Sequence, residues 1–242
     1  MQYPKGKIQE MTISSKELGE DMDLLVYLPA DYSPFCQYSL LIAQDGKDYF
    51  RFGRIARVVD EYLYEGEIEN LIIAGIPYKT VPDRWRKYHP DGEQHHSYIR
   101  FLANEVVPLL DREFSTSQMG STRALIGDSL GATVSLMTAL HYPHTFGKVL
   151  LQSPLVNNHI LETVKNFTKP ELLNIYHVVG NEETAVDETD GTISNFIIPN
   201  RKLSQLFLEK NFRYFYDEFN GGHLWKFWQP DLRRALKKMF HV

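Results

Sequence analysis

A short segment near the middle of the chain constrains the fold more than any other. Residues 123–126 (RALI) form a run typical of a buried strand, GDSLG follows at 127–131, and apolar residues at helical spacing run from residue 134 to 140. A chain that passes from strand to helix over one residue forces that residue into a strained backbone conformation. The flanking glycines remove Cβ atoms that would otherwise collide. The sequence therefore predicts a tight strand–helix turn with Ser129 at its apex.

Such a turn gives Ser129 a distinctive chemical environment. It lifts the hydroxyl above the edge of a sheet at the positive end of the next helix, and the Leu130 amide is then free to donate to an oxyanion. This geometry is a nucleophile elbow. The GxSxG pattern alone also fits a plain turn with two glycines or a phosphate-binding loop. A dinucleotide-binding fingerprint, GxGxxG, is absent.

Composition is ordinary for a soluble globular protein, with 43% hydrophobic and 24% charged residues. A length of 242 residues fits one domain, 1–242, and we see no linker or repeat. The net charge of −5 and the lack of a basic stripe argue against nucleic-acid binding. No stretch has the length of a secretory signal or a membrane span, and the single cysteine, Cys36, suits a reducing compartment. We therefore expect a cytoplasmic protein without nucleic-acid or membrane partners; the oligomeric state stays open, with a homodimer as one option.

The order of predicted elements indicates an α/β fold. An antiparallel hairpin at 8–15 and 22–29 opens the chain, and strands and helices alternate from residue 38 onward. This alternation predicts a mostly parallel sheet with helices on both faces. Strands are expected at 38–43, 71–77, 123–126, 148–152, 172–179 and 212–219, and helices at 49–64, 97–112 (with a possible kink at Pro108), after Ser129, and at 158–167, 199–210 and 224–240. Residues 78–96 lack periodicity and are expected to form a long, functional loop.

A serine hydroxyl is a poor nucleophile alone, so the elbow needs an acid and then a histidine further along the chain. His223 is the best candidate base, because the glycines of NGGHLW at 220–225 allow a turn that carries the imidazole toward Ser129. The alternative is that His223 has only a structural role, as a polar cap on the last helix. Five carboxylates after the penultimate strand are candidates for the acid: Glu182, Glu183, Asp187, Glu188 and Asp190. Glu183 is our first choice and Asp187 the reserve.

Other residues are candidates for binding. An amide of Gly46 or Lys47, in the loop after strand 38–43, pairs with that of Leu130 in a predicted oxyanion hole, although this loop also reads as a simple turn. Predicted substrate contacts are Arg84, Trp85, Tyr88 and Trp225. The adjacent His95 and His96 point in different directions and have no partner at ligand spacing, so we expect no metal and no cofactor.

Together these pieces resemble the esterase D family of α/β-hydrolases, which includes enterochelin (siderophore) esterases and feruloyl esterases. The resemblance covers residues 22–240. It rests on the following motifs: Asp45-Gly46, Ala74-Gly75-Ile76 followed by Arg84 and Tyr88-His89-Pro90, Phe101-Leu102 with Glu105 to Pro108, the GDSLG elbow, Asn200-Arg201 with Leu203, and Gly222-His223-Leu224-Trp225 with Trp228. It implies a three-layer α/β-hydrolase fold, with a mostly parallel sheet and an antiparallel N-terminal hairpin.

The resemblance also implies roles: Ser129 as nucleophile, His223 as base, and Glu183 as acid, because relatives place a carboxylate three residues after the glycine that ends the strand. Some relatives use a Ser–His dyad. Compared with the siderophore hydrolases, this chain has about ten extra residues between Glu183 and Asn200. Asp128 stands where formylglutathione hydrolases have a histidine.

The sequence thus predicts a serine esterase acting on a small-molecule ester. One alternative is hydrolysis of a siderophore trilactone, motivated by the basic residues around Arg84. The other is a hydrolase-like scaffold that binds without turnover.

Overall fold

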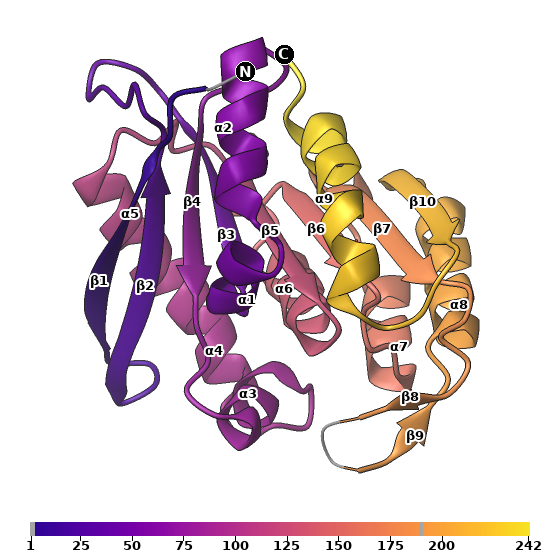
Figure 1. Cartoon of the computed structure of the whole chain (residues 1–242). Helices are drawn as coiled ribbons and strands as arrows, with labels where there is room; N and C mark the ends of the chain where they lie inside the picture. The colour runs from indigo at the N-terminus through magenta and orange to yellow at the C-terminus, as the bar shows by residue number, and fades with distance from the viewer. Residues whose placement is uncertain (1–2, 189–190) are drawn as a thin grey trace.

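The computed structural model describes residues 3–188 and 191–242 and contains an eight-stranded, mostly parallel sheet (Figure 1). The strand order is β1-β2-β4-β3-β5-β6-β7-β10. The strands are β1 (Lys7–Ser15), β2 (Glu20–Leu28), β3 (Ser39–Gln44), β4 (Leu71–Ile76), β5 (Arg123–Asp128), β6 (Lys148–Gln152), β7 (Asn174–Gly180) and β10 (Arg213–Phe219). The β1–β2 and β2–β4 pairs are antiparallel and the others parallel. The predicted fold class, including the antiparallel N-terminal hairpin, is confirmed.

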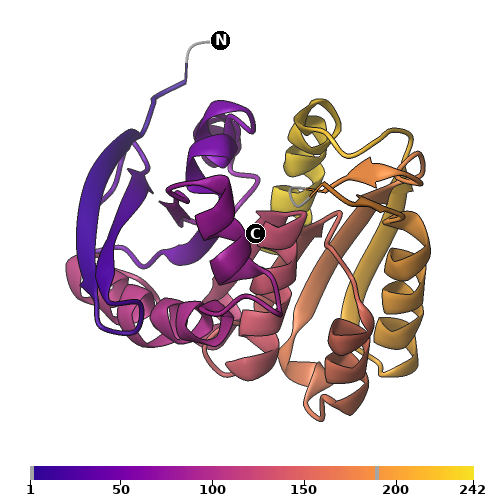
Figure 2. The same ribbon diagram turned by 90° about the horizontal axis from the view of Figure 1, so that it is seen from below.

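Helices cover both faces of the sheet (Figure 2). They are α1 (Gly46–Arg51), α2 (Ile55–Glu65), α3 (Val81–Tyr88), α4 (His95–Phe101), α5 (Val107–Glu113), α6 (Leu130–His141), α7 (Asn158–Asn166), α8 (Ile197–Glu209) and α9 (Trp225–Phe240), with short turns η1 (Leu102–Val106), η2 (Gly120–Thr122) and η3 (Pro170–Leu172). α1, α2 and α9 pack on one face, and α4 to α8 pack on the other. The result is the expected three-layer arrangement.

Alternating side chains of the buried strands supply both cores. In β3, Leu40 and Ile42 join the core under α4 to α8, whereas Leu41 and Ala43 join the core under α2 and α9. All four side chains are at most 1% exposed. Because successive strand residues point to opposite faces, a strand buried on both faces reads as a continuous apolar run. This is why the central strands were recognisable in the sequence.

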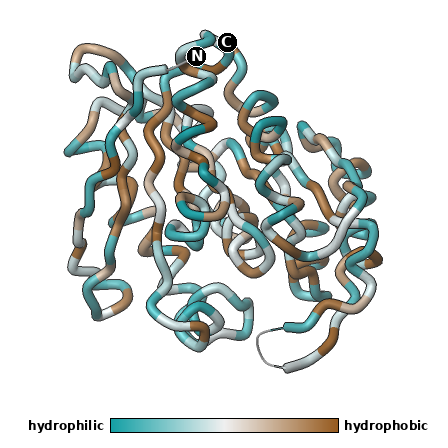
Figure 3. Tube along the Cα trace, in the orientation of Figure 1, coloured by the Kyte–Doolittle hydropathy of each residue, from teal (hydrophilic) through white to brown (hydrophobic). Residues whose placement is uncertain are grey.

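The segment predicted as a loop at 78–96 contains α3, so that prediction was wrong. Thr80 caps this helix by accepting a hydrogen bond from the Asp83 amide at 3.2 Å, and Pro82 lies in its first turn. The buried face of α3 carries charged residues, and its stretch of the chain is largely hydrophilic in Figure 3. Apolar periodicity therefore could not reveal the helix.

Two predicted helices are interrupted in the structure. The helix expected at 49–64 is divided into α1 and α2 around Arg54, which has φ of 51°. The helix expected at 97–112 contains the π-helical turn η1, where the Val107 amide donates to the Leu102 carbonyl. Pro108 has no amide hydrogen to continue the α-helical pattern, and such a residue permits a local change of register.

Two segments lie beyond the carboxyl ends of the parallel strands, at the bottom of Figure 1. One contains α3, and the other is a small hairpin of β8 (Val186–Asp187) and β9 (Ile193–Ser194). In α/β sheets this edge is where binding sites form, because loops from several strands meet there. The predicted site residues come from these loops.

Candidate active site

Ser129 occupies the strained turn that the sequence predicted. Its φ of 52° and ψ of −124° lie outside the helical and strand regions, and α6 begins at the next residue. Its amide donates to the Gln152 carbonyl at 2.9 Å, which fixes the turn to β6. A Cβ on Gly127 would lie 2.1 Å from the Gly131 carbonyl carbon, so a side chain there cannot be accommodated. Gly127 is therefore needed to bring the helix this close to the strand.

His223 and Glu183 form a hydrogen-bonded pair. The His223 Nδ1 atom lies 2.7 Å from Glu183 Oε2, and the Glu183 side chain is fully buried. Asp187 is an exposed residue of β8 and makes no such contact, and Asp190 lies outside the described residues. Since a carboxylate can only accept, Nδ1 carries a proton, and in the neutral imidazole Nε2 is then an acceptor. Among the residues that the structure describes, Nε2 has no hydrogen-bond partner.

The second oxygen of Glu183 is held by two donors. Oε1 accepts from the Ser153 hydroxyl at 2.6 Å and from the Gly180 amide at 2.8 Å. The Trp228 indole in turn donates to Ser153 Oγ at 3.0 Å. The analysis of the sequence did not assign Ser153 or Trp228 to the site. Their positions, at the end of β6 and one helical turn after the histidine motif, were the available signals.

Ser129 and His223 line the same pocket, which has a volume of about 230 Å³. The other lining residues are Asp45, Asp48, Tyr78, Val81, Arg84, Asp128, Leu130, Val186, Asp187, Glu188, Phe196, Trp225 and Trp228. They come from the ends of β3 and β5, from α1, α3, α6 and α9, and from the segments after β4, around β8 and before α8. The predicted serine, histidine, Arg84 and Trp225 are thus brought together at one edge of the sheet.

The predicted oxyanion donors lie at the first turns of two helices. Leu130 is the first residue of α6, and Gly46 and Lys47 begin α1. The first amides of a helix have no intrahelical acceptor and are available to a ligand. Leu130 lines the pocket, and the α1 segment reaches it through Asp45 and Asp48. A Cβ on Gly46 would lie 2.4 Å from the Gly75 carbonyl carbon, so this glycine permits close contact with β4 rather than with a ligand.

Arg84 does not present a free positive charge to the pocket. Its Nε lies 2.9 Å and 3.0 Å from the two carboxylate oxygens of Asp45, and its Nη2 lies 2.7 Å from Oδ2. Both side chains are at least nine-tenths buried, so the pair is shielded from solvent. Arg84 also donates to the Asp128 carbonyl at 3.3 Å. It therefore ties α3 and the α1 loop to the elbow.

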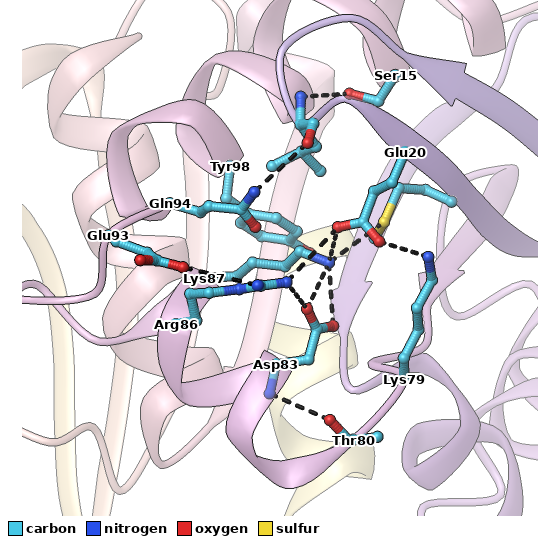
Figure 4. Close-up of polar contacts among 12 residues, drawn as sticks. Ser15, Glu20, Lys79, Thr80, Asp83, Arg86, Lys87, Glu93, Gln94 and Tyr98 are labelled. Carbon is cyan, nitrogen blue, oxygen red and sulfur yellow. Dashed lines mark hydrogen bonds and ion pairs between the residues drawn. The ribbon is translucent and has the colours of Figure 1, made fainter.

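The other basic residues of this segment face a separate network beside the β1–β2 hairpin (Figure 4). The buried Lys87 ammonium lies 2.7 Å from Glu20 and 2.9 Å from Asp83. Arg86 pairs with Asp83 at 2.8 Å, and Lys79 pairs with Glu20. None of these basic side chains lines the pocket.

Two predicted substrate contacts lie outside the described lining of the pocket. Trp85 stacks on the ring of His89, with the ring centroids 4.7 Å apart. Tyr88 is 1% exposed, and its hydroxyl accepts a hydrogen bond from the Asp45 amide at 3.4 Å. Both side chains take part in the packing of α3. In the loop predicted for this segment they could have faced the edge of the sheet, but the helix directs them elsewhere.

Asp128 has an unusual environment beside Ser129. It is 6% exposed, and its Oδ1 atom is buried without a hydrogen-bond partner among the described residues. Burial, together with the nearby Asp45 carboxylate, raises the pKa of Asp128 to about 8. Burial and Asp45 also raise the pKa of Asp48. The pocket beside the elbow is therefore rich in carboxyl groups that lack positive partners.

The adjacent histidines, His95 and His96, lie at the start of α4. His95 is 1% exposed, and burial with the neighbouring His96 lowers its pKa to about 4. Within residues 3–188 and 191–242, no group of three or more histidine, cysteine or carboxylate side chains is arranged to hold a metal ion. Across the same residues, every helix is too short or too polar to span a lipid bilayer.

Comparison with known proteins places this chain in a family. The uncharacterized protein YjcH of Bacillus subtilis (strain 168) is 53% identical over 234 residues, which cover 97% of this chain and 98% of that protein. An acetyl esterase of Caldicellulosiruptor saccharolyticus is 21% identical over 97% of this chain and 98% of its own length.

Solved structures share the fold at low identity. A ferulic acid esterase superposes with a TM-score of 0.79 at 15% identity and 99% coverage of both chains. The enterochelin esterase of Shigella flexneri superposes with a TM-score of 0.83 at 18% identity; this chain is covered over 98% of its length and spans 59% of that one. The resemblance to esterases seen in the sequence is confirmed. The family model described as "Putative esterase" matches residues 15–239, and the chain belongs to this esterase family.

Proposed function

We propose that this protein is a serine carboxylesterase that hydrolyses a small-molecule ester through an acyl-enzyme. Membership of the esterase family supports ester hydrolysis. The observation that carries the serine mechanism is the 2.7 Å contact between His223 and the buried Glu183 at a pocket that the strained Ser129 also lines. A nucleophile, a base and an orienting acid in this arrangement are what acyl transfer requires.

Each residue has a defined role in the proposed reaction. Ser129 Oγ attacks the ester carbonyl, and His223 Nε2 accepts its proton while Glu183 holds the Nδ1 proton in place. The Leu130 amide, with an amide of Gly46 or Lys47, stabilises the oxyanion. The intermediate expels the alcohol, which receives the proton from His223. Water then attacks the acyl-enzyme by the same route and releases the acid, and Ser129 regains its proton.

The positive charge on which the siderophore alternative was based is not available in the pocket. It depended on basic residues around Arg84, and of the described residues that line the pocket Arg84 is the only arginine or lysine. Asp45 neutralises it, and several carboxyl groups remain. An anionic substrate would meet net negative charge there, which is unfavourable.

A fluorophosphonate probe and p-nitrophenyl esters test the proposal. We expect covalent labelling of Ser129 and turnover of short esters, with both lost in Ser129→Ala. Ser121→Ala is the matched control, because Ser121 is an exposed serine ahead of the same strand. If the wild-type protein is neither labelled nor active, the scaffold alternative replaces the enzyme. If Ser129→Ala retains activity, Ser129 is not the nucleophile and the serine mechanism proposed here is wrong.

A further inference from the structure

Negative charge in the pocket exceeds positive charge at the end next to Ser129. Asp45, Asp48 and Asp128 all line the pocket, and the Asp45 carboxylate raises the pKa of both other residues. Arg84 neutralises Asp45 through three contacts of 2.7 to 3.0 Å. Among the described residues, Asp48 and Asp128 form no ion pair; Asp48 has a hydrogen bond with the Tyr78 hydroxyl. Two carboxyl groups are therefore left without a cation.

Asp128 has a carboxyl oxygen without a hydrogen-bond partner among the described residues, and its side chain lines the pocket. The residue is 6% exposed, lines the pocket, and has a buried Oδ1 without a partner in the described part of the chain. Leaving a buried polar atom unpaired costs free energy, and native structures rarely accept it without a reason. A donor on the substrate would complete this site.

The remaining walls suit an organic cation better than an anion or a metal ion. Tyr78 and Trp225 line the pocket, and aromatic faces attract ammonium groups. Asp187 and Glu188, from the β8 segment, add carboxylates to its lining. No arrangement of three metal-ligating side chains exists within the described residues, so these carboxyl groups do not form a metal site.

We infer that the substrate of this enzyme carries a protonated amine, which donates to the unpartnered Asp128 and lies within reach of Asp48 while Ser129 attacks the ester. This inference rests on the proposed esterase function and specifies its substrate class. A primary ammonium fits better than a quaternary one, because Oδ1 lacks an N–H donor and not only a positive charge. The amine lies near the scissile carbonyl, because Asp128 and Ser129 are consecutive.

Pairs of esters that differ only in this charge test the inference. On the acyl side, p-nitrophenyl esters of β-alanine and 6-aminohexanoic acid are compared with the butanoate and heptanoate, in which methyl replaces ammonium. On the alcohol side, 6-aminohexyl acetate is compared with heptyl acetate. Each kcat/KM is divided by the uncatalysed hydrolysis rate constant. We expect the wild type to favour the ammonium ester by about 10-fold or more in at least one pair, as a charge-assisted hydrogen bond predicts.

Two variants test whether Asp128 is responsible for this preference. Asp128→Asn should lower the ratio of ammonium to neutral turnover by about 10-fold. Asp21→Asn removes the charge of an exposed β2 residue outside the pocket and should leave the ratio unchanged. Equal or better turnover of the neutral ester in every pair, or an unchanged ratio in Asp128→Asn, overturns the inference while the esterase function stands. Absence of turnover of all six esters together with absence of labelling at Ser129 refutes the esterase function itself.

A binding measurement keeps the inference falsifiable if Asp128→Asn does not fold. Hexylammonium and 1-hexanol are tested as competitive inhibitors of the wild type against p-nitrophenyl butanoate. Tighter inhibition by hexylammonium, weakened by added salt, supports the ammonium site. Inhibition by 1-hexanol that is equal or tighter overturns it.

Discussion

Replacement of Glu183 by glutamine should disable the proposed base although it changes little of the side chain's shape. Oε1 of Glu183 accepts from the Ser153 hydroxyl at 2.6 Å and the Gly180 amide at 2.8 Å. In Glu183→Gln the amide oxygen must therefore take this position, because the NH₂ group cannot accept from two donors. The NH₂ group then faces His223 Nδ1, 2.7 Å from the present Oε2.

This orientation determines the size of the effect. An NH₂ group donates, so Nδ1 must become the acceptor and the proton must move to Nε2, where it prevents His223 from receiving the Ser129 proton. Wrong-tautomer substitutions in serine hydrolase triads lower kcat by about 10⁴-fold, which corresponds to about 5 kcal/mol of transition-state stabilisation. We expect a loss of about 10³- to 10⁴-fold in kcat, with a smaller change in KM.

The assay is steady-state hydrolysis of p-nitrophenyl butanoate, with thermal unfolding as a check on folding. Glu182→Gln is the control, because this exposed neighbour carries the same charge and makes no contact with His223. A folded Glu183→Gln variant that keeps kcat within about 10-fold of the wild type would refute the tautomer argument. It would indicate instead that the enzyme works as a Ser–His dyad.

Two further substitutions test the local structure around the elbow. Gly127→Ala places a Cβ 2.1 Å from the Gly131 backbone, and we expect a loss of about 3 kcal/mol or more in the free energy of unfolding, measured in urea; a loss below about 1 kcal/mol would show that the turn can relax. The free energy of unfolding of Asp128→Asn should increase relative to that of the wild type as the pH rises from about 5 to about 8.5. The folded-state pKa of Asp128, about 8, lies above the ordinary aspartate value of 3.8, so its protonated form favours folding at low pH and this contribution is lost as the pH rises through about 8. Urea midpoints of both proteins at several pH values measure this difference, and a difference independent of pH would contradict the buried position of Asp128.

The elbow and the strands of the sheet could be predicted from the sequence because neighbouring residues determine their conformation. GDSLG at 127–131 predicted the turn, since a strand that becomes a helix over one residue admits few side chains next to it. The buried strands were visible as short apolar runs, and His223 was marked by its glycines. In each case neighbours in sequence set the backbone conformation.

The acid and the contents of the pocket depended on contacts between distant segments. Five carboxylates were open to choice until the fold placed Glu183 against Ser153 and His223. The helix α3 was missed because its buried face carries charged residues. Arg84 gives the pocket no net positive charge because the carboxylate of Asp45, 39 positions earlier in the chain, pairs with it. A side chain's ionic partners and solvent exposure are properties of its surroundings in space. The sequence therefore determined the turn at Ser129, the buried strands and the set of candidate reactive residues, whereas the tertiary structure decided which charges remain unpaired at the pocket.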